Sequence, residues 1–255
     1  MSSLANQIII STRPISAEDS LKSQLQQKGA VVLDFPLIKI CPFPLTDEIK
    51  NTLLQINDYQ WVAFTSKNGV KLFFQFLKEL GIQKDALSVL KIAVVGKKTA
   101  EEVLKNNCSP SLISSGNNSL DLANELAEVL KPSDNILLPL AELADDTMIN
   151  RLGALANVSR LNVYQTKDEE QIDLEIVRRI IRDDYSIILF TSPSGFRHFH
   201  KIMIANNITS NIRAACMGTT TEKEMLLYNC TPILVSSRSD SESFATQLEH
   251  SLKNL

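Results

Sequence analysis

Short apolar runs alternate with amphipathic stretches along almost the whole chain. Runs such as WVAF, IAVV and ILLPL are apolar throughout, which is typical of strands that are buried on both faces. Between such runs, VKLFFQFLKEL and SLDLANEL repeat apolar residues three and four positions apart, the spacing of a helix with one buried face. Ser, Thr or Gly stands at each turn from strand to helix. The alternation predicts parallel strands covered by helices, an α/β fold.

A hydroxyl-rich turn occurs twice in the chain. FTSKNG, Phe64 to Gly69, returns as FTSPSG, Phe190 to Gly195. The stretches that follow, residues 93–108 and 215–230, align at one constant shift. Identical residues then meet at Ala93, Gly96, Thr99, Glu102, Leu104, Asn107 and Cys108. The chain therefore contains two copies of one α/β unit.

The second copy ends earlier than the first. The first continues with a strand NILLPL, a helix DDTMINRLGALANV and a strand SRLNVYQT, whereas the second stops at Leu255. The N-terminal segment offers the missing pieces: a strand QIIIST, a helix SAEDSLKSQLQQKG and a strand AVVLDFPL. We therefore expect two similar flavodoxin-like, parallel-sheet domains, one discontinuous (1–37 and 171–255) and one continuous (46–164).

Two connecting passages, residues 38–45 and 165–170, must then run between the domains. Pro36 just before the first passage, and Pro42 and Pro44 within it, favour an extended chain over a helix there. Side by side, the two passages could form a short antiparallel ribbon that acts as a hinge. We expect the two domains to face each other across a cleft.

Composition narrows the class of protein. A hydrophobic content of 44% with 22% charged residues is ordinary for a soluble globular chain. The longest apolar runs are far shorter than the ~20 residues of a membrane-spanning helix, and MSSLANQIII lacks the pattern of a secretion signal. A net charge of −3 disfavours general nucleic-acid binding but leaves a local basic cleft open. We expect a cytoplasmic monomer without membrane or nucleic-acid partners.

Neither cysteines nor histidines predict a metal site. His198 and His200 are two positions apart, so on a helix they would point to different faces. No C-x-x-C spacing links the four cysteines, which we interpret as reduced structural thiols. They are Cys41, Cys108, Cys216 and Cys230.

Hydroxyl-bearing, glycine and basic residues follow the predicted strands in both copies. Ligands of open α/β sheets bind beyond the carboxyl ends of the strands, where helix N-termini present unpaired N–H groups. Each turn taken alone is better explained as a helix cap than as a ligand contact. The repetition and the positive charges instead favour a polyanion bound by both domains. The candidate binding residues are Arg13, Thr65, Ser66, Lys67, Asn68, Gly96, Lys97, Thr99, Thr191, Ser192, Ser194, Thr219 and Thr220, with Lys98 and the 236–238 turn beside them.

The common catalytic signatures are missing from the sequence. It contains no G-x-x-x-x-G-K-[ST] phosphate loop, no G-x-G-x-x-G, no G-x-S-x-G and no H-E-x-x-H. An enzyme built this way must work mainly by positioning its substrate. Tyr164, in the crossing strand LNVYQT, is the candidate catalytic residue, because a protonated phenol can donate to a leaving oxygen. The alternative is an aromatic residue that only packs in the ribbon.

Several motifs occur in a fixed order: ISTRP, WVAFTSKNGV, VVGKKTA, VYQT, ILFTSPSGFRHF and MGTTT. With them the chain resembles the uroporphyrinogen-III synthase family over essentially its full length. The resemblance implies two α/β domains joined by a two-stranded linker, no cofactor, and a linear tetrapyrrole substrate, hydroxymethylbilane, with eight carboxylates. It also implies the reaction of haem biosynthesis in which water is lost, the last ring (ring D) is inverted, and uroporphyrinogen III closes.

Residue roles follow from the resemblance. Tyr164 matches the tyrosine thought to assist departure of the hydroxyl, and the turn residues match those expected to face the substrate. Arg13 could pair with a substrate carboxylate or only support its turn. Lys67, Lys97 and Lys98 are candidates because of their charge alone.

One segment departs from the family pattern. Many relatives have an Arg- and Gly-rich stretch where this chain has Ala141, Glu142, Asp145 and Asp146, and negative groups there would repel a polycarboxylate. The alternative hypothesis is therefore a non-catalytic two-domain polyanion-binding protein or a degenerate relative of the synthase. A nucleotide-dependent enzyme would need a phosphate loop. Beyond the tetrapyrrole, transient contact with the preceding enzyme of the pathway is the remaining partner hypothesis.

Overall fold

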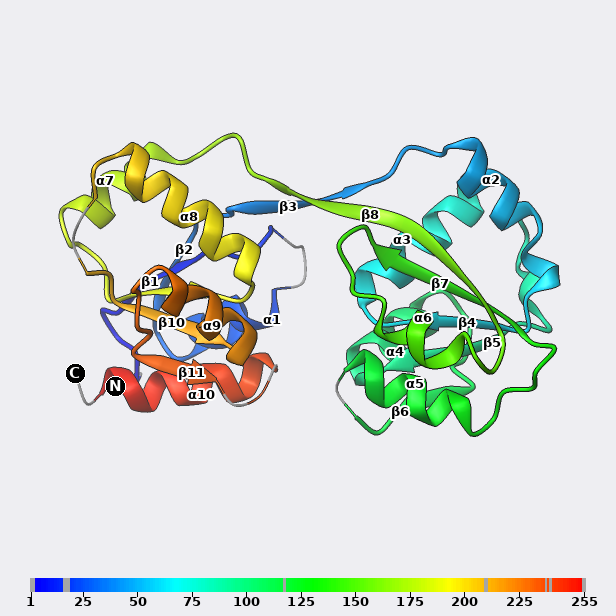
Figure 1. Cartoon of the computed structure of the whole chain (residues 1–255). Coiled ribbons are helices and arrows are strands. Elements are labelled where there is room, and N and C mark those ends of the chain that lie inside the picture. Colours follow the sequence, from blue (N-terminus) through cyan, green and yellow to red (C-terminus); the bar gives the residue numbers. More distant parts are fainter. Residues whose placement is uncertain are drawn as a thin grey trace. The chain divides into compact units, whose positions relative to one another are not determined.

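The computed structural model describes residues 3–15, 19–116, 118–208, 211–236, 238 and 240–253, without the side chain of Lys84 (Figure 1). The start of the expected helix at 16–18, and Ser237 of the 236–238 turn, lie outside these residues. The chain divides into two compact units. Unit 1 is Met1–Lys39 with Lys167–Leu255, and unit 2 is Ile40–Thr166.

Unit 2 is built on a sheet with the strand order β3-β8-β7-β4-β5-β6. Every strand pair among β4 to β8 for which the register is known is parallel. The strands are β3 (Ile38–Pro42), β4 (Trp61–Phe64), β5 (Lys91–Val95), β6 (Leu112–Ser114), β7 (Asn135–Ala141) and β8 (Asn157–Asp168). The helices are α2 (Asp47–Leu54), α3 (Lys67–Glu79), α4 (Gly96–Lys105), α5 (Ser119–Ala127) and α6 (Thr147–Leu152), with short 3-10 turns at Ile56–Asp58 and Lys84–Leu87.

Unit 1 repeats this plan with the chain permuted. Its sheet has the order β11-β10-β9-β1-β2, and all the strand pairs are parallel. The strands are β1 (Ile8–Ser11), β2 (Val31–Asp34), β9 (Ile187–Phe190), β10 (Ala214–Met217) and β11 (Leu234–Ser236). The helices are α1 (Ser20–Gln27), α7 (Leu174–Ile181), α8 (Pro193–Ala205), α9 (Thr219–Leu227) and α10 (Ser241–Leu252).

The strand orders explain why the repeat wraps around the chain ends. β9, β10 and β11 correspond to β4, β5 and β6, and the N-terminal β1 and β2 take the places that β7 and β8 hold in unit 2. The expected α/β class, with parallel sheets and one discontinuous domain, is thereby confirmed.

Each sheet is covered by helices on both faces, which is why its strands are apolar at successive positions. In unit 2, α3 and α4 cover one face and α5 and α6 the other; in unit 1, α7, α8 and α9 lie opposite α1 and α10. The repeated Phe-Thr-Ser turn has the same anchor in both units. Phe64 packs edge-on against Phe73 with centroids 5.3 Å apart, and Phe190 packs against Phe199 at 5.1 Å. Such pairs are favourable beyond the area that they bury.

The connecting strands β3 and β8 lie side by side (Figure 1). The Phe43 N–H donates to the Val163 carbonyl at 3.1 Å, and the Glu169 N–H donates to the Leu37 carbonyl at 2.9 Å. Residue numbers rise along one strand while they fall along the other, so this pairing is antiparallel.

One expected element is shorter than the sequence suggested. The helix predicted over residues 145–158 is α6, which ends at Leu152. Gly153 follows directly, and Asn157 already pairs with Asn135 at the start of β8. A glycine disfavours continuation of the helix, and the sheet hydrogen bonds of β8 compete for the residues behind it.

The repeat provides a matched pair of glycine substitutions that tests the packing of the turn. A Cβ on Gly69 would lie 2.8 Å from the backbone carbonyl oxygen of Pro139, which cannot move without shifting β7. We expect Gly69→Ala to lower the free energy of unfolding of unit 2 by about 1–3 kcal/mol. Urea unfolding followed by the fluorescence of Trp61, the single tryptophan and a residue of unit 2, measures this change.

Gly195→Ala is the control in unit 1. Its Cβ would lie 3.1 Å from Ser192 Oγ, a side chain that can give by a few tenths of an ångström, and alanine favours a helix by roughly 0.5–1 kcal/mol. We expect a change close to zero, measured by circular dichroism. Equal losses in the two variants would contradict the packing difference between the copies.

Candidate active site

The candidate turn residues gather at the carboxyl edge of each sheet. Because β4 to β7 are parallel to one another, their carboxyl ends meet at one edge of unit 2. The same holds for β1, β9, β10 and β11 in unit 1. In open parallel sheets this edge is where ligands bind.

The turn after β4 brings two of the predicted residues into contact. Ser66 caps α3, its Oγ accepting the Gly69 N–H at 3.1 Å, and the Tyr164 hydroxyl lies 3.1 Å from the same oxygen. Tyr164 is only 8% exposed. Thr65 and Asn68 are half-buried beside this pair, whereas Lys67 is exposed.

A β-bulge decides where Tyr164 points. Leu140 pairs with Asn162 but Ala141 pairs with Tyr164, so Val163 is an extra residue in β8. In a regular strand, successive side chains point to opposite faces. Here Val163 and Tyr164 both pack into the cluster that contains Phe73 of α3. The bulge therefore turns Tyr164 towards the N-terminus of α3.

The Ser66–Tyr164 pair has two proton arrangements. A serine hydroxyl carries one hydrogen and two lone pairs, and the Gly69 N–H occupies one lone pair. If the Tyr164 O–H donates to Ser66, the phenol is engaged as a donor. If Ser66 donates to Tyr164, the phenolic proton is available for another acceptor, such as a departing hydroxyl group.

The turns after β5 and β10 differ from ordinary helix caps. Both α4 and α9 begin without a side-chain cap, next to Gly96 (φ 69°) and Gly218 (φ 81°). By contrast, side chains cap α3 and α8. Positive φ favours glycine at these positions, and the N–H groups of an uncapped first turn are suited to an anion. Capping therefore does not explain these two turns.

The other predicted residues of these turns vary in burial. Thr99 is only 5% exposed, which fits a packing role as well as a ligand contact. Lys97 and Lys98 are exposed on the first turn of α4, and Thr219 and Thr220 are exposed on the first turn of α9.

In unit 1 the second Phe-Thr-Ser turn has the same cap but, among the residues that the structure describes, no hydrogen bond to a tyrosine. The Ser192 Oγ accepts the Gly195 N–H at 3.1 Å and lies 3.3 Å from the Ser194 Oγ. Thr191 is half-buried beside it. Arg13 lies 3.2 Å from the Asp19 carboxylate, which caps α1. This pair supports the interpretation that Arg13 stabilises its own turn.

The acidic segment after β7 is largely engaged within unit 2. The Asp146 carboxylate accepts from Arg160 Nη1 at 2.6 Å. The hydroxyl and N–H of Thr147 lower the pKa of Asp145 below its ordinary value, with an N–H to Oδ1 distance of 3.0 Å. Two of the charges that raised doubt about a polycarboxylate ligand thus have their own partners.

Sequence reasoning missed Arg160. Its signal is the pair of polar residues Arg160 and Asn162, which alternate with the apolar residues Leu161 and Val163 in β8. Alternation of this kind predicts a second, polar face on β8.

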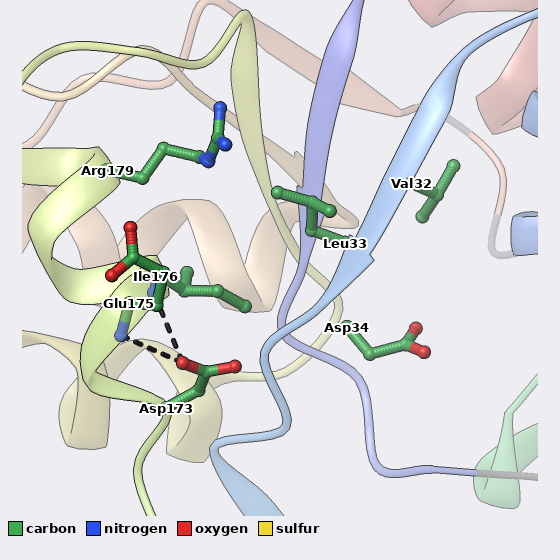
Figure 2. A pocket seen from close by; sticks show the side chains of 7 residues that line it. All are labelled: Val32, Leu33, Asp34, Asp173, Glu175, Ile176 and Arg179. Carbon is green, nitrogen blue, oxygen red and sulfur yellow. Dashed lines mark hydrogen bonds between the residues drawn. The ribbon is translucent and has the colours of Figure 1, made fainter.

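A hollow of about 400 Å³ between β2 and α7 lies elsewhere in unit 1 (Figure 2). Its lining contains the carboxylates of Asp34, Asp173 and Glu175 and one cation, Arg179. Asp173 is engaged as the cap of α7, accepting the N–H groups of Glu175 and Ile176. An excess of negative charge disfavours a polyanionic ligand in this hollow.

Two parallel α/β units with hydroxyl-bearing and glycine residues at the turns of their carboxyl edges define a doubly wound α/β protein. The family described as uroporphyrinogen-III synthase HemD matches residues 19–246. The chain therefore belongs to the uroporphyrinogen-III synthase family, lyase-type enzymes of porphyrin biosynthesis that act on a tetrapyrrole. The family expected from the motifs is confirmed.

Individual relatives agree with this assignment. The chain is 26% identical to the porphyrin biosynthesis protein HemD of Ruminiclostridium josui over 94% of its own length, but spans only 47% of that protein. It is 27% identical to a putative uroporphyrinogen-III synthase of Methanocaldococcus jannaschii, covering 89% of this chain and 91% of the relative.

Solved structures share the fold. A mutant uroporphyrinogen III synthase of Thermus thermophilus aligns with a TM-score of 0.63 at 15% identity, covering 98% of this chain and 100% of the other. Uroporphyrinogen-III synthetase of Helicobacter pylori aligns with a TM-score of 0.64 at 17% identity, covering 96% and 99%. Within the described residues, no helix is long and apolar enough to cross a membrane.

The two serine caps provide a matched test of the Ser66–Tyr164 contact. We expect Ser66→Ala and Ser192→Ala each to lower the free energy of unfolding by about 0.5–2 kcal/mol, because each removes a helix cap. Only Ser66→Ala should change the ring resonance of Tyr164, measured by NMR on protein labelled with ¹³C at the tyrosine ring carbon bonded to oxygen. An unchanged Tyr164 resonance in folded Ser66→Ala would contradict the hydrogen bond.

Proposed function

We propose that this chain is a uroporphyrinogen-III synthase that cyclises hydroxymethylbilane to uroporphyrinogen III, with loss of water and inversion of ring D. Family membership across residues 19–246 supports the reaction class, and a non-catalytic binding protein is not favoured. The observation that carries the proposal is the Tyr164 hydroxyl, 3.1 Å from Ser66 Oγ beside the turn that ends β4.

The first step of the reaction needs little assistance from the protein. Electrons from the pyrrole nitrogen expel the terminal hydroxyl, the carbon–oxygen bond breaks, and the pyrrole N–H loses its proton to give an azafulvene. The departing oxygen needs a proton to leave as water. We assign Tyr164 as the donor of a hydrogen bond to that oxygen, in the arrangement where Ser66 donates to the phenol.

Directing the second step, the closure of the ring, is harder than assisting the first. Unassisted closure joins the two ends of the linear tetrapyrrole directly and gives the type I macrocycle. Type III requires the substituted carbon of ring D to attack, forming a spiro intermediate whose fragmentation and reclosure invert the ring. Holding that geometry requires many fixed contacts rather than one strong acid or base.

We infer that the carboxylates of the substrate bind at the strand-end turns. The first turns of α4 and α9 support this role, because no side chain caps either helix within the described residues. Lys67, Lys97 and Lys98 add exposed positive charge in unit 2. The remaining turn residues stay predictions of the same kind. Four further expectations also stay predictions: the absence of a cofactor, the monomeric state, the cytoplasmic location and a transient contact with the preceding enzyme.

An isomer assay tests the function directly. Hydroxymethylbilane is generated in situ and mixed with the purified protein, without added metal or cofactor. The products are then oxidised, and uroporphyrins I and III are separated by chromatography. We expect type III to predominate, because the protein directs closure. Type I alone at the rate of the protein-free control would overturn the proposed function.

Tyr164→Phe tests the assigned donor. We expect kcat for formation of the type III isomer to fall about 100-fold, a typical loss for a general acid, with KM changed less than about twofold. The control is Tyr59→Phe, which removes a half-buried phenol oxygen elsewhere in unit 2. Full activity of Tyr164→Phe would remove Tyr164 from the mechanism without removing the fold.

A further inference from the structure

The guanidinium group of Arg160 binds the loop that follows β7, and all three of its nitrogen atoms make hydrogen bonds. Nη2, which carries two hydrogens, lies within hydrogen-bonding distance of three carbonyl oxygens: those of Ala141 at 2.9 Å, Glu142 at 2.8 Å and Ala144 at 3.0 Å. Nη1 donates to the Asp146 carboxylate at 2.6 Å, and Nε donates to Asn162 Oδ1 at 2.8 Å. The side chain is 22% exposed. Such a planar fork with fixed donors is specific to arginine.

The same loop forms the bulge that aims Tyr164. Ala141 is the partner of Tyr164 across the register shift, and the Glu142 N–H donates to the Tyr164 carbonyl at 2.8 Å. Arg160 thus binds the carbonyl groups of both residues that fix the backbone of Tyr164. A bulge interrupts the ladder, so its backbone groups need partners from elsewhere.

Arg160 and the Tyr164 ring act from opposite faces of the sheet. Arg160 pairs with Leu138, whose side chain packs in the cluster of α5 and α6. Tyr164 packs in the cluster of α3 and α4. Any influence of Arg160 on the phenol therefore passes through the backbone of the bulge.

Loss of the arginine would remove a donor from three loop carbonyls and from Asp146, although the Ala141 carbonyl would keep its bond from the Ala144 N–H at 3.1 Å. The Glu142 N–H, whose bond to the Tyr164 carbonyl belongs to the shifted register, would then lie on a loop that the guanidinium group no longer holds. Regular alternation would place Tyr164 on the face opposite Val163, away from Ser66.

We propose that Arg160 is a positioning residue: it fixes the bulge between β7 and β8 and so holds the Tyr164 hydroxyl against Ser66. Its catalytic consequence rests on the proposed function, but its structural consequence does not. Arg160 itself needs no contact with the substrate.

The first experiment measures the position of Tyr164 without using activity. Protein labelled with ¹³C at the tyrosine ring carbon bonded to oxygen is prepared as wild type, Arg160→Gln, Arg160→Lys and Ser66→Ala, with the Tyr164 signal assigned by its loss in Tyr164→Phe. We expect both Arg160 variants to shift this signal in the direction seen for Ser66→Ala. Lysine should not rescue it, because an ammonium cannot reproduce the fork.

Arg151→Gln is the matched control, since this arginine of the same unit donates from Nε to Asn124 Oδ1 at 2.8 Å, between α6 and α5. It should leave the Tyr164 signal in place. An unshifted Tyr164 signal in folded Arg160→Gln would overturn the proposal. If Arg160→Gln fails to fold, Asp146→Asn weakens one contact of the guanidinium group and should shift the signal less, in the same direction; no shift would again overturn it.

The second experiment is a double-mutant cycle on kcat for the type III isomer. We expect Arg160→Gln alone to lower kcat about tenfold with KM changed less than about twofold, but to lower it less than about twofold in the Tyr164→Phe background. A tenfold loss in both backgrounds would show that Arg160 does not act through Tyr164. Absence of type III product from the wild type would refute the proposed function and leave the NMR result standing.

Discussion

Parallel strand pairing is the constraint on which the rest of the structure depends. Because the strands of the repeat run the same way, every strand-to-helix turn falls at the same edge of its sheet. Helix N-termini gather there as well, and their first N–H groups lack partners within the helix and carry a partial positive charge. A protein with a net charge of −3 can therefore present an anion-binding edge that its composition does not reveal.

The two copies of the unit share their core but not their chemistry. Both Phe-Thr-Ser turns anchor a phenylalanine pair and cap a helix with serine, which is how one turn sequence serves two sheets. Within the part of the chain that the structure describes, only the copy in unit 2 adds a phenol to the serine. The difference between the two turns arises because β8 carries a bulge that brings Tyr164 to the turn after β4.

The acidic residues after β7 have partners within the folded protein that the sequence does not reveal. As isolated charges, Asp145 and Asp146 would oppose a polycarboxylate substrate. In the fold, Asp146 completes the set of acceptors around Arg160, and Asp145 bonds the first residue of α6. Their charge stabilises the geometry of the loop, and that loop supports the backbone of Tyr164.

The sequence by itself determined the α/β class, the wrapped repeat, the turn residues and the candidate tyrosine, because hydrophobic period and residue identity are local properties. It extended α6 too far, since sheet pairing at Asn157 overrides helix pattern. Tertiary structure alone decided the direction of Tyr164 and the role of Arg160. Strict alternation along β8 puts Tyr164 on the face opposite Val163, and only the pairing with β7 inserts the extra residue that reverses it.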